Sequence, residues 1–397
     1  MKKKVLFMVS SMNIGGVEKS LLSLLSAISK DNYEITILTL ESKGGFLDYI
    51  PSHIKVEEAK WFKDIKPIIM ESPQTTIKRY LKSGKLFRIA SFIYSYYKSK
   101  NSGDRYIYYK NILKSIPMNK KAYDVAISYA GPTEIIDVYI GNKINAKKKI
   151  AWVHFDISKH KVNEKLYEKL YEKFDKIFAV SNEANKKLNE IIPSTINKSE
   201  VMLNIISKEL ICEMAEESVY FDNYYDGIKI VTVGRLSKEK GQDLAIKALY
   251  KLKKDGYKIR WYCVGDGNSR KDFEELIKEY NLEKDFILLG ETPNPYPYIK
   301  RSDIYVQTSR HEGYCLTLAE AKALCKPIIS TNFIGAYEQI QDKVNGMIAE
   351  INEDKVYECI KYIISNEKLI TELTNNLKDI DVSTVDNVNK LIDYIES

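Results

Sequence analysis

The sequence predicts an α/β protein made of two doubly wound domains that face a central cleft. Three observations support this fold class. The chain has 397 residues, which is more than one hydrophobic core usually serves. Strand-like and helix-like segments alternate in both halves, which predicts parallel sheets. The alternation stops at an acidic, aromatic stretch near residues 205–227 and then begins again, so this stretch is expected to join the domains.

The first half begins with a β-α-β pattern. Its expected elements are a strand at 4–10, a helix at 17–29 and strands at 34–40, 123–129, 148–154 and 176–181. The charged start followed by an apolar run is superficially similar to a signal peptide. That run, residues 5–9, has about five residues, whereas a signal peptide needs roughly 7–15. We therefore interpret it as a buried first strand.

The second half repeats the pattern. Its expected strands are 228–234, 258–265, 286–290, 303–309 and 327–331, with helices at 241–256 and 317–325, a proline-rich turn at 291–302 and helical pattern through 353–396. We place a first Rossmann-like domain at 1–205 and a second at 206–382, and we expect the last helix, 383–397, to return to the first domain.

Composition narrows the class of protein. With 44% hydrophobic and 29% charged residues the chain is an ordinary globular protein. No window offers the roughly 18 apolar residues of a membrane span. The five cysteines are odd in number and lack CxxC spacing, which argues against a disulfide framework or a zinc site and agrees with a reducing cytoplasm. We expect all five to be core or near-core residues.

The net charge of +7 is unevenly distributed. Residues 60–121 hold 15 Lys and Arg against three acidic residues, a net charge of +12 for this basic block. Such a block indicates an anionic partner. If 75–100 is helical, it would present an apolar stripe beside a cationic face, which suits the plane of an anionic membrane. The alternative is a helix pair packed on the first domain. No recognition module accompanies the block, so nucleic acid is not expected as a partner.

Ligands of doubly wound domains bind outside the carboxyl ends of the strands, so the loops there are candidate sites. Gly15 and Gly16 enter a helix whose N-terminus could hold an anion, or they form a plain turn. Arg235 and Lys240 share one loop and could hold phosphate, or they are solvated charges. Gly265 belongs to a lone G-x-G, which is either a tight turn or a loop close to a nucleotide.

The stretch SRHEGYCLTLAEAKALCKP, residues 309–327, places Glu312 and Glu320 on either side of a helix start. Thr317 and Glu320 match the T-x-x-E capping box, so Glu320 could be purely structural. Glu312 could equally be a surface carboxylate. The N–H groups near Leu316 and Thr317 would cradle phosphate or an oxyanion. Carboxylates beside such a cradle suit hydroxyl groups, as in a sugar or ribose next to a diphosphate.

The second half then resembles a known family, the retaining family-4 glycosyltransferases of GT-B fold (glycosyl transferases group 1). The resemblance lies in VGRLSKEKGQDLAIKAL, CVGDGNSRKDFEELIKEYNLEKDFILLGE, SDIYVQTSRHEGYCLTLAEAKALCKPII and VNGMI. The first half is similar only in NIGGVEKSLLSLL, IAWVHFD and FAVSN. The family resemblance implies that 1–205 is the acceptor domain and 206–382 the nucleotide-sugar donor domain.

The resemblance implies residue roles. Glu312 would contact the donor sugar and Glu320 the ribose. His154 would lie near the sugar and the acceptor. Taken alone, a histidine at a strand end could equally be a hydrogen-bonded core residue. Arg235 and Lys240 would stabilise the departing diphosphate, which Gly15 and Gly16 would approach from the opposite domain. The implied catalytic residues are Glu312, His154, Arg235 and Lys240, and the implied donor-binding residues are Gly15, Gly16, Arg235, Lys240, Gly265, Gly313, Leu316, Thr317 and Glu320. Cys315 stands where the family usually has glycine, so the sugar is left unassigned.

The expected function is transfer of a sugar, with retention of configuration, from a nucleotide-diphosphate donor, expected to be a UDP-sugar, to a glycan or lipid-linked acceptor in cell-surface polysaccharide synthesis. No cofactor or metal ion is expected, because fixed cations can stabilise the leaving group. The expected location is the cytoplasm, at the inner face of the membrane. The alternatives are a sugar-nucleotide epimerase, a non-catalytic nucleotide-sugar-binding protein and a glycosidase, which would use paired carboxylates without needing the two cations.

Overall fold

The computed structural model describes residues 2–84, 86–155, 157–159, 162–219, 221, 225–312, 314–380 and 382–397. The chain divides into two compact units. Unit 1 is Met1–Asn204 with Asp386–Ser397, and unit 2 is Ile205–Val385. These boundaries lie one and three residues from the expected ones, and the last helix belongs to unit 1.

Unit 1 is built on a parallel sheet in the order β3-β2-β1-β4-β5-β6-β7 within the described residues. Its strands are β1 (Lys3–Val9), β2 (Tyr33–Thr39), β3 (Lys55–Glu58), β4 (Ala122–Ser128), β5 (Asn145–Val153), β6 (Lys176–Ala179) and β7 (Ser199–Val201). Residues 5–9 of β1 are buried, as a central strand covered on both faces requires. The chain reverses direction across the sheet between β1 and β4, so this is the switch point of unit 1.

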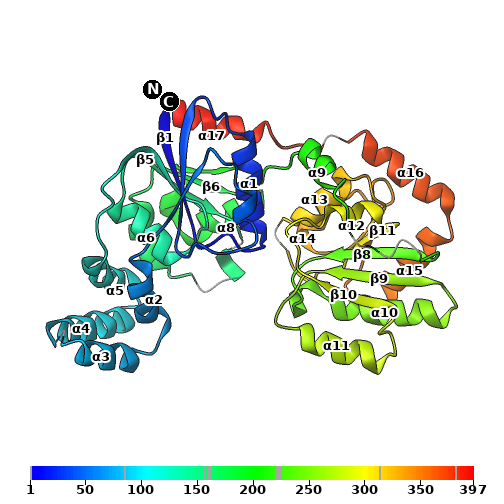
Figure 1. The fold of residues 1–397 in the computed structure, drawn as a ribbon, viewed down its shortest axis with the longest axis horizontal. Helices are drawn as coiled ribbons and strands as arrows, with labels where there is room; N and C mark the ends of the chain where they lie inside the picture. Colours follow the sequence, from blue (N-terminus) through cyan, green and yellow to red (C-terminus); the bar gives the residue numbers. More distant parts are fainter. Residues whose placement is uncertain are drawn as a thin grey trace. The chain divides into compact units, whose positions relative to one another are not determined.

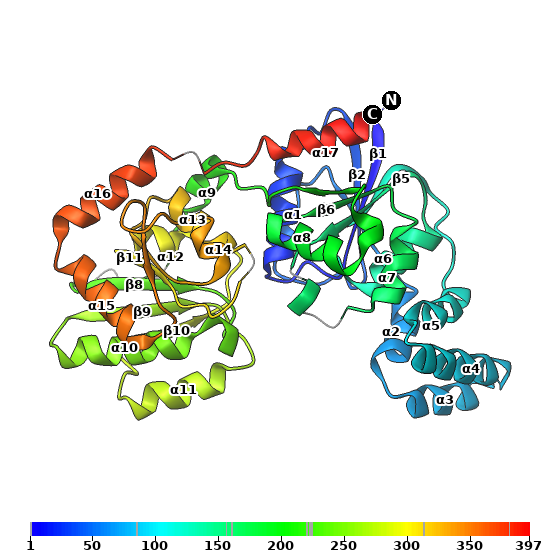
Figure 2. The same cartoon turned by 180° about the vertical axis from the view of Figure 1, so that it is seen from behind.

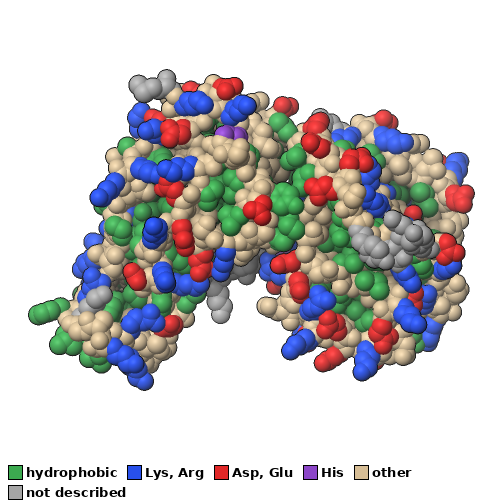
Figure 3. Space-filling view, in the orientation of Figure 1, with side chains coloured by type: hydrophobic (Ala, Val, Ile, Leu, Met, Phe, Trp, Pro, Cys, Tyr) green, Lys and Arg blue, Asp and Glu red, His purple; other side chains and the backbone are tan. Residues whose placement is uncertain are grey.

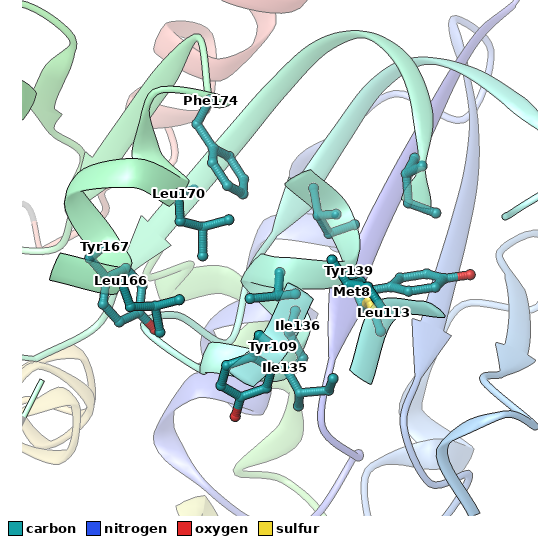
Figure 4. Packing of buried hydrophobic residues seen from close by; sticks show 14 of the residues in the cluster. Met8, Tyr109, Leu113, Ile135, Ile136, Tyr139, Leu166, Tyr167, Leu170 and Phe174 are labelled. Carbon is teal, nitrogen blue, oxygen red and sulfur yellow. The ribbon is translucent and has the colours of Figure 1, made fainter. Parts of the chain in front are cut away.

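Helices cover the sheet of unit 1 (Figure 1). The helices of unit 1 are α1 (Gly16–Ala27), α2 (Phe62–Met70), α3 (Pro73–Lys82), α4 (Leu86–Ser102), α5 (Arg105–Ile112), α6 (Glu134–Lys143), α7 (Glu164–Tyr171), α8 (Asn182–Ile191) and α17 (Asn387–Glu396). Of these, α3 and α4 do not cover the sheet but project away from it (Figures 1 and 2). Buried side chains from β1, α5, α6 and α7 converge in one part of its core (Figure 4).

Helix α17 closes unit 1 beside the first strand, and the two chain ends lie together in both views (Figures 1 and 2). Its apolar face buries Val388, Leu391 and Ile395. Polar contacts fix its end: Lys3 Nζ lies 2.9 Å from Glu396 Oε2, and Tyr33 OH donates to Glu396 Oε1 at 2.7 Å. The apolar stripe explains the return, because an isolated helix of this length is marginal without a surface to cover.

The basic block 60–121 forms helices α2 to α5, not a single long helix over 75–100. Ser83 and Gly84 end α3, and Gly84 has φ 68°, the left-handed conformation that glycine adopts most easily. Helices α3 and α4 therefore pack as a pair, and α4 packs on α5. Of the two predicted arrangements, the helix pair is the one observed, and a continuous stripe over 75–100 is not.

Unit 2 has a parallel sheet in the order β10-β9-β8-β11-β12-β13 within the described residues. Its strands are β8 (Ile228–Val233), β9 (Ile259–Val264), β10 (Phe286–Gly290), β11 (Ile304–Gln307), β12 (Ile328–Thr331) and β13 (Met347–Ala349). Strands β8 and β11 are neighbours, so the switch point of unit 2 lies between them.

The helices of unit 2 bury both faces of its sheet, in two apolar clusters. They are α9 (Lys208–Met214), α10 (Gln242–Lys254), α11 (Arg270–Glu279), α12 (Tyr296–Arg301), α13 (Leu316–Ala323), α14 (Ile334–Tyr337), α15 (Glu353–Ile364) and α16 (Glu367–Lys378). The proline-rich segment expected to be a turn contains α12. Pro295 and Pro297 stand at the start of this helix, where the missing N–H costs no hydrogen bond.

The cysteines are all free thiols. Cys263 and Cys315 are buried, and Cys325 and Cys359 are partly buried, but Cys212 is exposed. The prediction that all five are core or near-core residues is wrong for Cys212, which lies on the outer face of α9. Across the described residues, no helix combines the length and apolar character that a membrane span requires.

Candidate functional site

The predicted donor-site residues of unit 2 gather in the loops that follow β8 and β11, on either side of the switch point. Lys240 ends the short 3₁₀ helix η5 (Lys238–Lys240) after β8, and Glu312 lies in the loop after β11. Because parallel neighbours end at the same sheet edge, the two loops come together although they are far apart in sequence. The structure thus unites the two sequence-predicted loops.

Lys240 and Glu312 form an ion pair, with Nζ 2.8 Å from Oε2 and side-chain exposures of 26% and 11%. Burial lowers the pKa of Lys240, but the nearby charge of Glu312 and their hydrogen bond outweigh it, so the pKa of Lys240 is raised. Lys240 is therefore a permanent cation at neutral pH. A positive charge on a largely buried side chain is weakly screened by water, so it is well suited to stabilising an anionic leaving group.

A chain of buried polar side chains holds Glu312 in place. Its Oε1 accepts from Ser309 Oγ and, at 3.1 Å, from Gln307 Nε2. The amide of Gln307 is itself oriented by Tyr305, whose OH donates to Gln307 Oε1 at 2.6 Å. Gln307 and Ser309 were missed by the sequence reasoning. The signal in the sequence was two polar residues at the end of a strand-like apolar run. The structure shows that both are fully buried.

A second contact joins the two loops. Arg310 donates to both carboxylate oxygens of Asp243, Nη1 at 2.7 Å and Nη2 at 2.6 Å. Gly241 has φ 67°, and a Cβ there would lie 2.1 Å from the carbonyl oxygen of Thr308. Only glycine allows this approach. The forked ion pair and the close packing fix the loop of Lys240 against the loop of Glu312.

Arg235 begins the same loop and is exposed, while its carbonyl oxygen accepts from Gln242 Nε2 at 2.9 Å. In the described part of the chain no salt bridge to Arg235 is recorded. Gly265, after β9, has φ 146°, and a Cβ there would lie 2.1 Å from the carbonyl oxygen of Gly234. Strand packing alone accounts for this glycine, and its contact with a donor stays a prediction.

Glu320 does not cap its own helix. The N-cap of α13 is Cys315, whose side chain makes no capping hydrogen bond, and Thr317 already lies inside the helix. Glu320 is 2% exposed, and its Oε1 accepts from Tyr296 OH of α12 at 3.3 Å. The capping-box interpretation is therefore wrong, because packing of α13 on α12 directs this carboxylate inward. The first-turn N–H groups of α13, at Leu316 and Thr317, have no side-chain cap. Gly313 lies outside the described residues.

In unit 1, Gly15 is the N-cap of α1 and Gly16 its first residue, directly after the switch-point strand β1. Gly15 has no side chain that could cap this helix, but the carboxylate of Glu18 in the first turn lies at the helix start, where a Cβ on Gly15 would be 2.6 Å from Glu18 Oε2. An anion here would share the first-turn N–H groups with that carboxylate, so the anion site stays a prediction. Buried hydrogen bonds of Ser20 hold α1 in place. Its Oγ donates to Asn204 Oδ1 at 2.7 Å and lies 2.8 Å from Tyr129 OH.

His154 follows β5, and its backbone N–H donates to the carbonyl oxygen of Gly131 at 3.2 Å. Its ring centroid lies 4.7 Å from that of Tyr129, and its Nε2 is shielded from solvent without a hydrogen-bond partner among the described residues. Burial lowers the pKa of His154 to about 3, although a hydrogen bond with the Tyr129 backbone opposes this. The imidazole is neutral at pH 7, so it can exchange hydrogen bonds with a ligand but supplies no positive charge.

The depressed pKa of His154 predicts acid sensitivity. The unfolded state takes up the proton near pH 6.5 and the folded state only near 3, so this contribution to stability is complete above pH 6.5 and is lost as the pH falls. Between pH 6 and 5 the wild type should lose about 1.2 kcal/mol of unfolding free energy relative to His154→Gln. Urea unfolding measures this, with exposed His53→Gln as the control. If the unfolding free energy changed equally with pH in the wild type and in His154→Gln, the lowered pKa would not belong to His154.

The chain is similar to known glycosyltransferases. Residues 220–379 match the family described as glycosyl transferases group 1. An uncharacterized glycosyltransferase of Methanocaldococcus jannaschii is 30% identical over 212 residues, 50% of this chain and 52% of that protein. The N-acetylgalactosamine-N,N'-diacetylbacillosaminyl-diphospho-undecaprenol 4-alpha-N-acetylgalactosaminyltransferase of Campylobacter jejuni is 31% identical over 183 residues, 46% of this chain and 48% of that enzyme. The matches span about half the length of these curated relatives.

Solved structures are similar along the whole chain. Anabaena HepE in complex with UDP-glucose has a TM-score of 0.70 at 16% identity, covering 99% of this chain and 100% of that one. Staphylococcus aureus TarM, crystallised with UDP among other ligands, has a TM-score of 0.68 at 15% identity, covering all of both chains. At this identity the likeness shows the fold, which is GT-B.

Proposed function

Residues 220–379 belong to the glycosyl transferases group 1 family, and from this premise we propose that the protein is a retaining glycosyltransferase that uses a nucleotide-diphosphate sugar. The observation that carries the proposal is the Lys240–Glu312 ion pair at the switch point of unit 2. It puts a cation, for a departing phosphate, directly beside a carboxylate that can accept hydrogen bonds from sugar hydroxyls. Their position at the switch point, where ligands of doubly wound domains bind, supports a donor site over an ordinary ion pair.

In the proposed reaction the bond between the sugar and the diphosphate breaks, and negative charge grows on the departing phosphate. Lys240 and Arg235 stabilise that charge, and the uncapped N-terminus of α13 adds N–H donors. Because Lys240 and the start of α13 are held in place before the reaction, they need little reorganisation. Support for transfer without a metal ion lies in this permanent positive charge.

Glu312 is proposed to bind the donor sugar, and Glu320 the ribose. In retaining transfer from the front face, the leaving phosphate takes the proton of the acceptor hydroxyl as the new glycosidic bond forms. This route needs no carboxylate nucleophile, and so it agrees with a Glu312 that is already engaged by Lys240, Ser309 and Gln307.

Unit 1 is proposed to bind the acceptor, with His154 as a neutral hydrogen-bonding group and Gly15 and Gly16 opposite the donor diphosphate. The Campylobacter relative is named for transfer to a diphospho-undecaprenol-linked sugar, and the HepE and TarM structures contain UDP or UDP-glucose. By this analogy we propose a UDP-sugar donor and a glycan or lipid-linked acceptor, at a membrane where surface polysaccharide is made.

A donor screen tests the proposal. The protein is incubated with UDP-, GDP-, ADP- and dTDP-sugars, and nucleotide release and thermal shift are followed with and without EDTA. We expect UDP-sugars to raise the melting temperature and one of them to release UDP, with no loss in EDTA. Thermal shift without release in the presence of acceptor extracts would favour a non-catalytic binding protein, and isomerisation of the sugar without an acceptor would favour an epimerase.

A further inference from the structure

The turn between α3 and α4 exposes three large apolar side chains. Leu81 is 53% exposed, Leu86 61% and Phe87 97%. They flank Ser83 and Gly84, where the chain reverses. Hydrophobic side chains project at this end of the α3–α4 pair, with Lys and Arg side chains nearby (Figure 3). Leaving a whole phenylalanine in water is costly, so an apolar partner would be favourable at this turn.

The remainder of the hairpin is firmly packed. Tyr80 and Phe92 are buried against each other, with ring centroids 6.0 Å apart in an edge-to-face arrangement. Asn111 of α5 makes three hydrogen bonds to α4: its Nδ2 donates to Ser95 Oγ at 2.8 Å and to the carbonyl oxygen of Ser91 at 3.2 Å, and its Oδ1 accepts from Ser91 Oγ at 2.9 Å. The apolar stripe expected to lie on a membrane is therefore used for internal packing. Part of the apolar surface of the hairpin stays exposed: the turn residues project from this packed base, and Tyr94 and Tyr97 of α4 are 63% and 57% exposed.

The surroundings of the turn are cationic. Residues 72–103 contain no Asp or Glu. Lys78 and Lys82 are exposed on α3, and with Thr75, Arg79 and Leu81 they line a shallow hollow of about 540 Å³. Arg79 is held by Glu71, with Nη2 2.8 Å from Oε2. The two lysines thus lie beside the exposed leucine, at a spacing of one helical turn, and face outward.

We propose that this turn is a membrane-insertion element: Leu81, Leu86 and Phe87 enter the outer part of a bilayer while Lys78 and Lys82 bind anionic lipid headgroups. A convex apolar tip ringed by lysines matches a bilayer whose interior is apolar and whose surface is negative. A second copy of the same turn is a poor partner, because it would bring like charges together. The proposal does not rest on the glycosyltransferase activity.

Two double variants of the full chain test the insertion, with binding to vesicles of phosphatidylcholine containing phosphatidylglycerol, and to phosphatidylcholine alone, measured by co-sedimentation. Leu86→Ser with Phe87→Ser should lower the partition coefficient on anionic vesicles at least tenfold, since two apolar side chains no longer enter the bilayer. Lys78→Gln with Lys82→Gln should lower it roughly thirtyfold at low salt, from about 1 kcal/mol per lysine. The replaced side chains are exposed, so the melting temperature should stay unchanged.

Matched controls lie on unit 2. Tyr362→Ser removes an exposed aromatic side chain on α15, and Lys271→Gln with Lys278→Gln removes two exposed lysines on α11. Both should bind vesicles like the wild type. In addition, Phe87→Trp should gain a blue-shifted emission component with anionic vesicles that the wild type lacks.

Three results would overturn the proposal. The first is equal vesicle binding by the wild type and the turn variants. The second is equal binding of the wild type to anionic and neutral vesicles. The third is that the Leu86→Ser, Phe87→Ser variant loses self-association but keeps vesicle binding, which would identify a second copy as the partner. Because no donor sugar enters the assay, its outcome is independent of the donor screen.

Discussion

Replacing Lys240 with Ala is expected to lower turnover by roughly 10²–10³-fold while changing the affinity for free UDP much less. The ammonium group is held half-buried by Glu312, and its raised pKa keeps it charged at every pH at which the enzyme would be assayed. A fixed charge at the leaving phosphate stabilises the transition state, where the phosphate is most negative, more than the bound donor. Steady-state kinetics with the donor found in the screen, beside UDP titration, separates the two effects.

Lys238→Ala is the matched control for this variant. Lys238 lies in the same 3₁₀ helix and has the same charge, but its residue is exposed and only its carbonyl oxygen is used, by Arg310. Its turnover should stay within about twofold of the wild type, because exposed charges are screened by water and salt. A Lys240→Ala enzyme that turns over like the Lys238→Ala enzyme would remove the leaving-group role.

Replacing Glu312 with Gln is expected to lower turnover by roughly 10²-fold. The amide keeps the shape of the side chain but loses the charge, so hydrogen bonds from sugar hydroxyls weaken from charge-assisted to neutral ones. Lys240 would also lose its ion-pair partner. The release of UDP from the donor sugar measures the loss, and binding of UDP alone, which has no sugar hydroxyls to contact Glu312, should be nearly unchanged.

Glu239→Gln removes a neighbouring carboxylate that is exposed on η5 and serves as its control. It should leave turnover unchanged. Should Glu312→Gln retain wild-type turnover, the carboxylate has only a structural part in holding Lys240, and the proposed contact with the donor sugar would be abandoned.

The order of elements follows from local sequence. The apolar runs that become β1, β8 and β9 were predicted within three residues of their observed ends. The short strands β3, β7 and β13 went unpredicted. Unlike β6, β11 and β12, which have four residues each and were predicted, none of them has two adjacent buried residues, so they lack a clear apolar run. Glycine weakens a helix, but whether the chain reverses at Gly84 depends on what α4 packs against.

The candidate site was predictable only where local sequence marks it. Lys240 and Glu312 were identified because each follows a strand-like run. The partners that hold them were not. Arg310 and Asp243 are 67 residues apart, and nothing local to either indicates that they meet. The capping box at Thr317 and Glu320 satisfied every local rule and was still wrong, because a helix start is decided by the whole loop before it.

The sequence by itself determined the alternation of strands and helices, the two-domain division and the loops that carry charge, because apolar periodicity and chain order are local properties. Only the tertiary structure decided which charges are paired, which carboxylate is buried and which apolar side chains stay in water. Glu312 is turned toward a lysine 72 residues earlier, Glu320 toward a tyrosine of another helix, and Phe87 toward solvent. These choices depend on packing between segments that are distant in the chain, and local pattern does not contain that information.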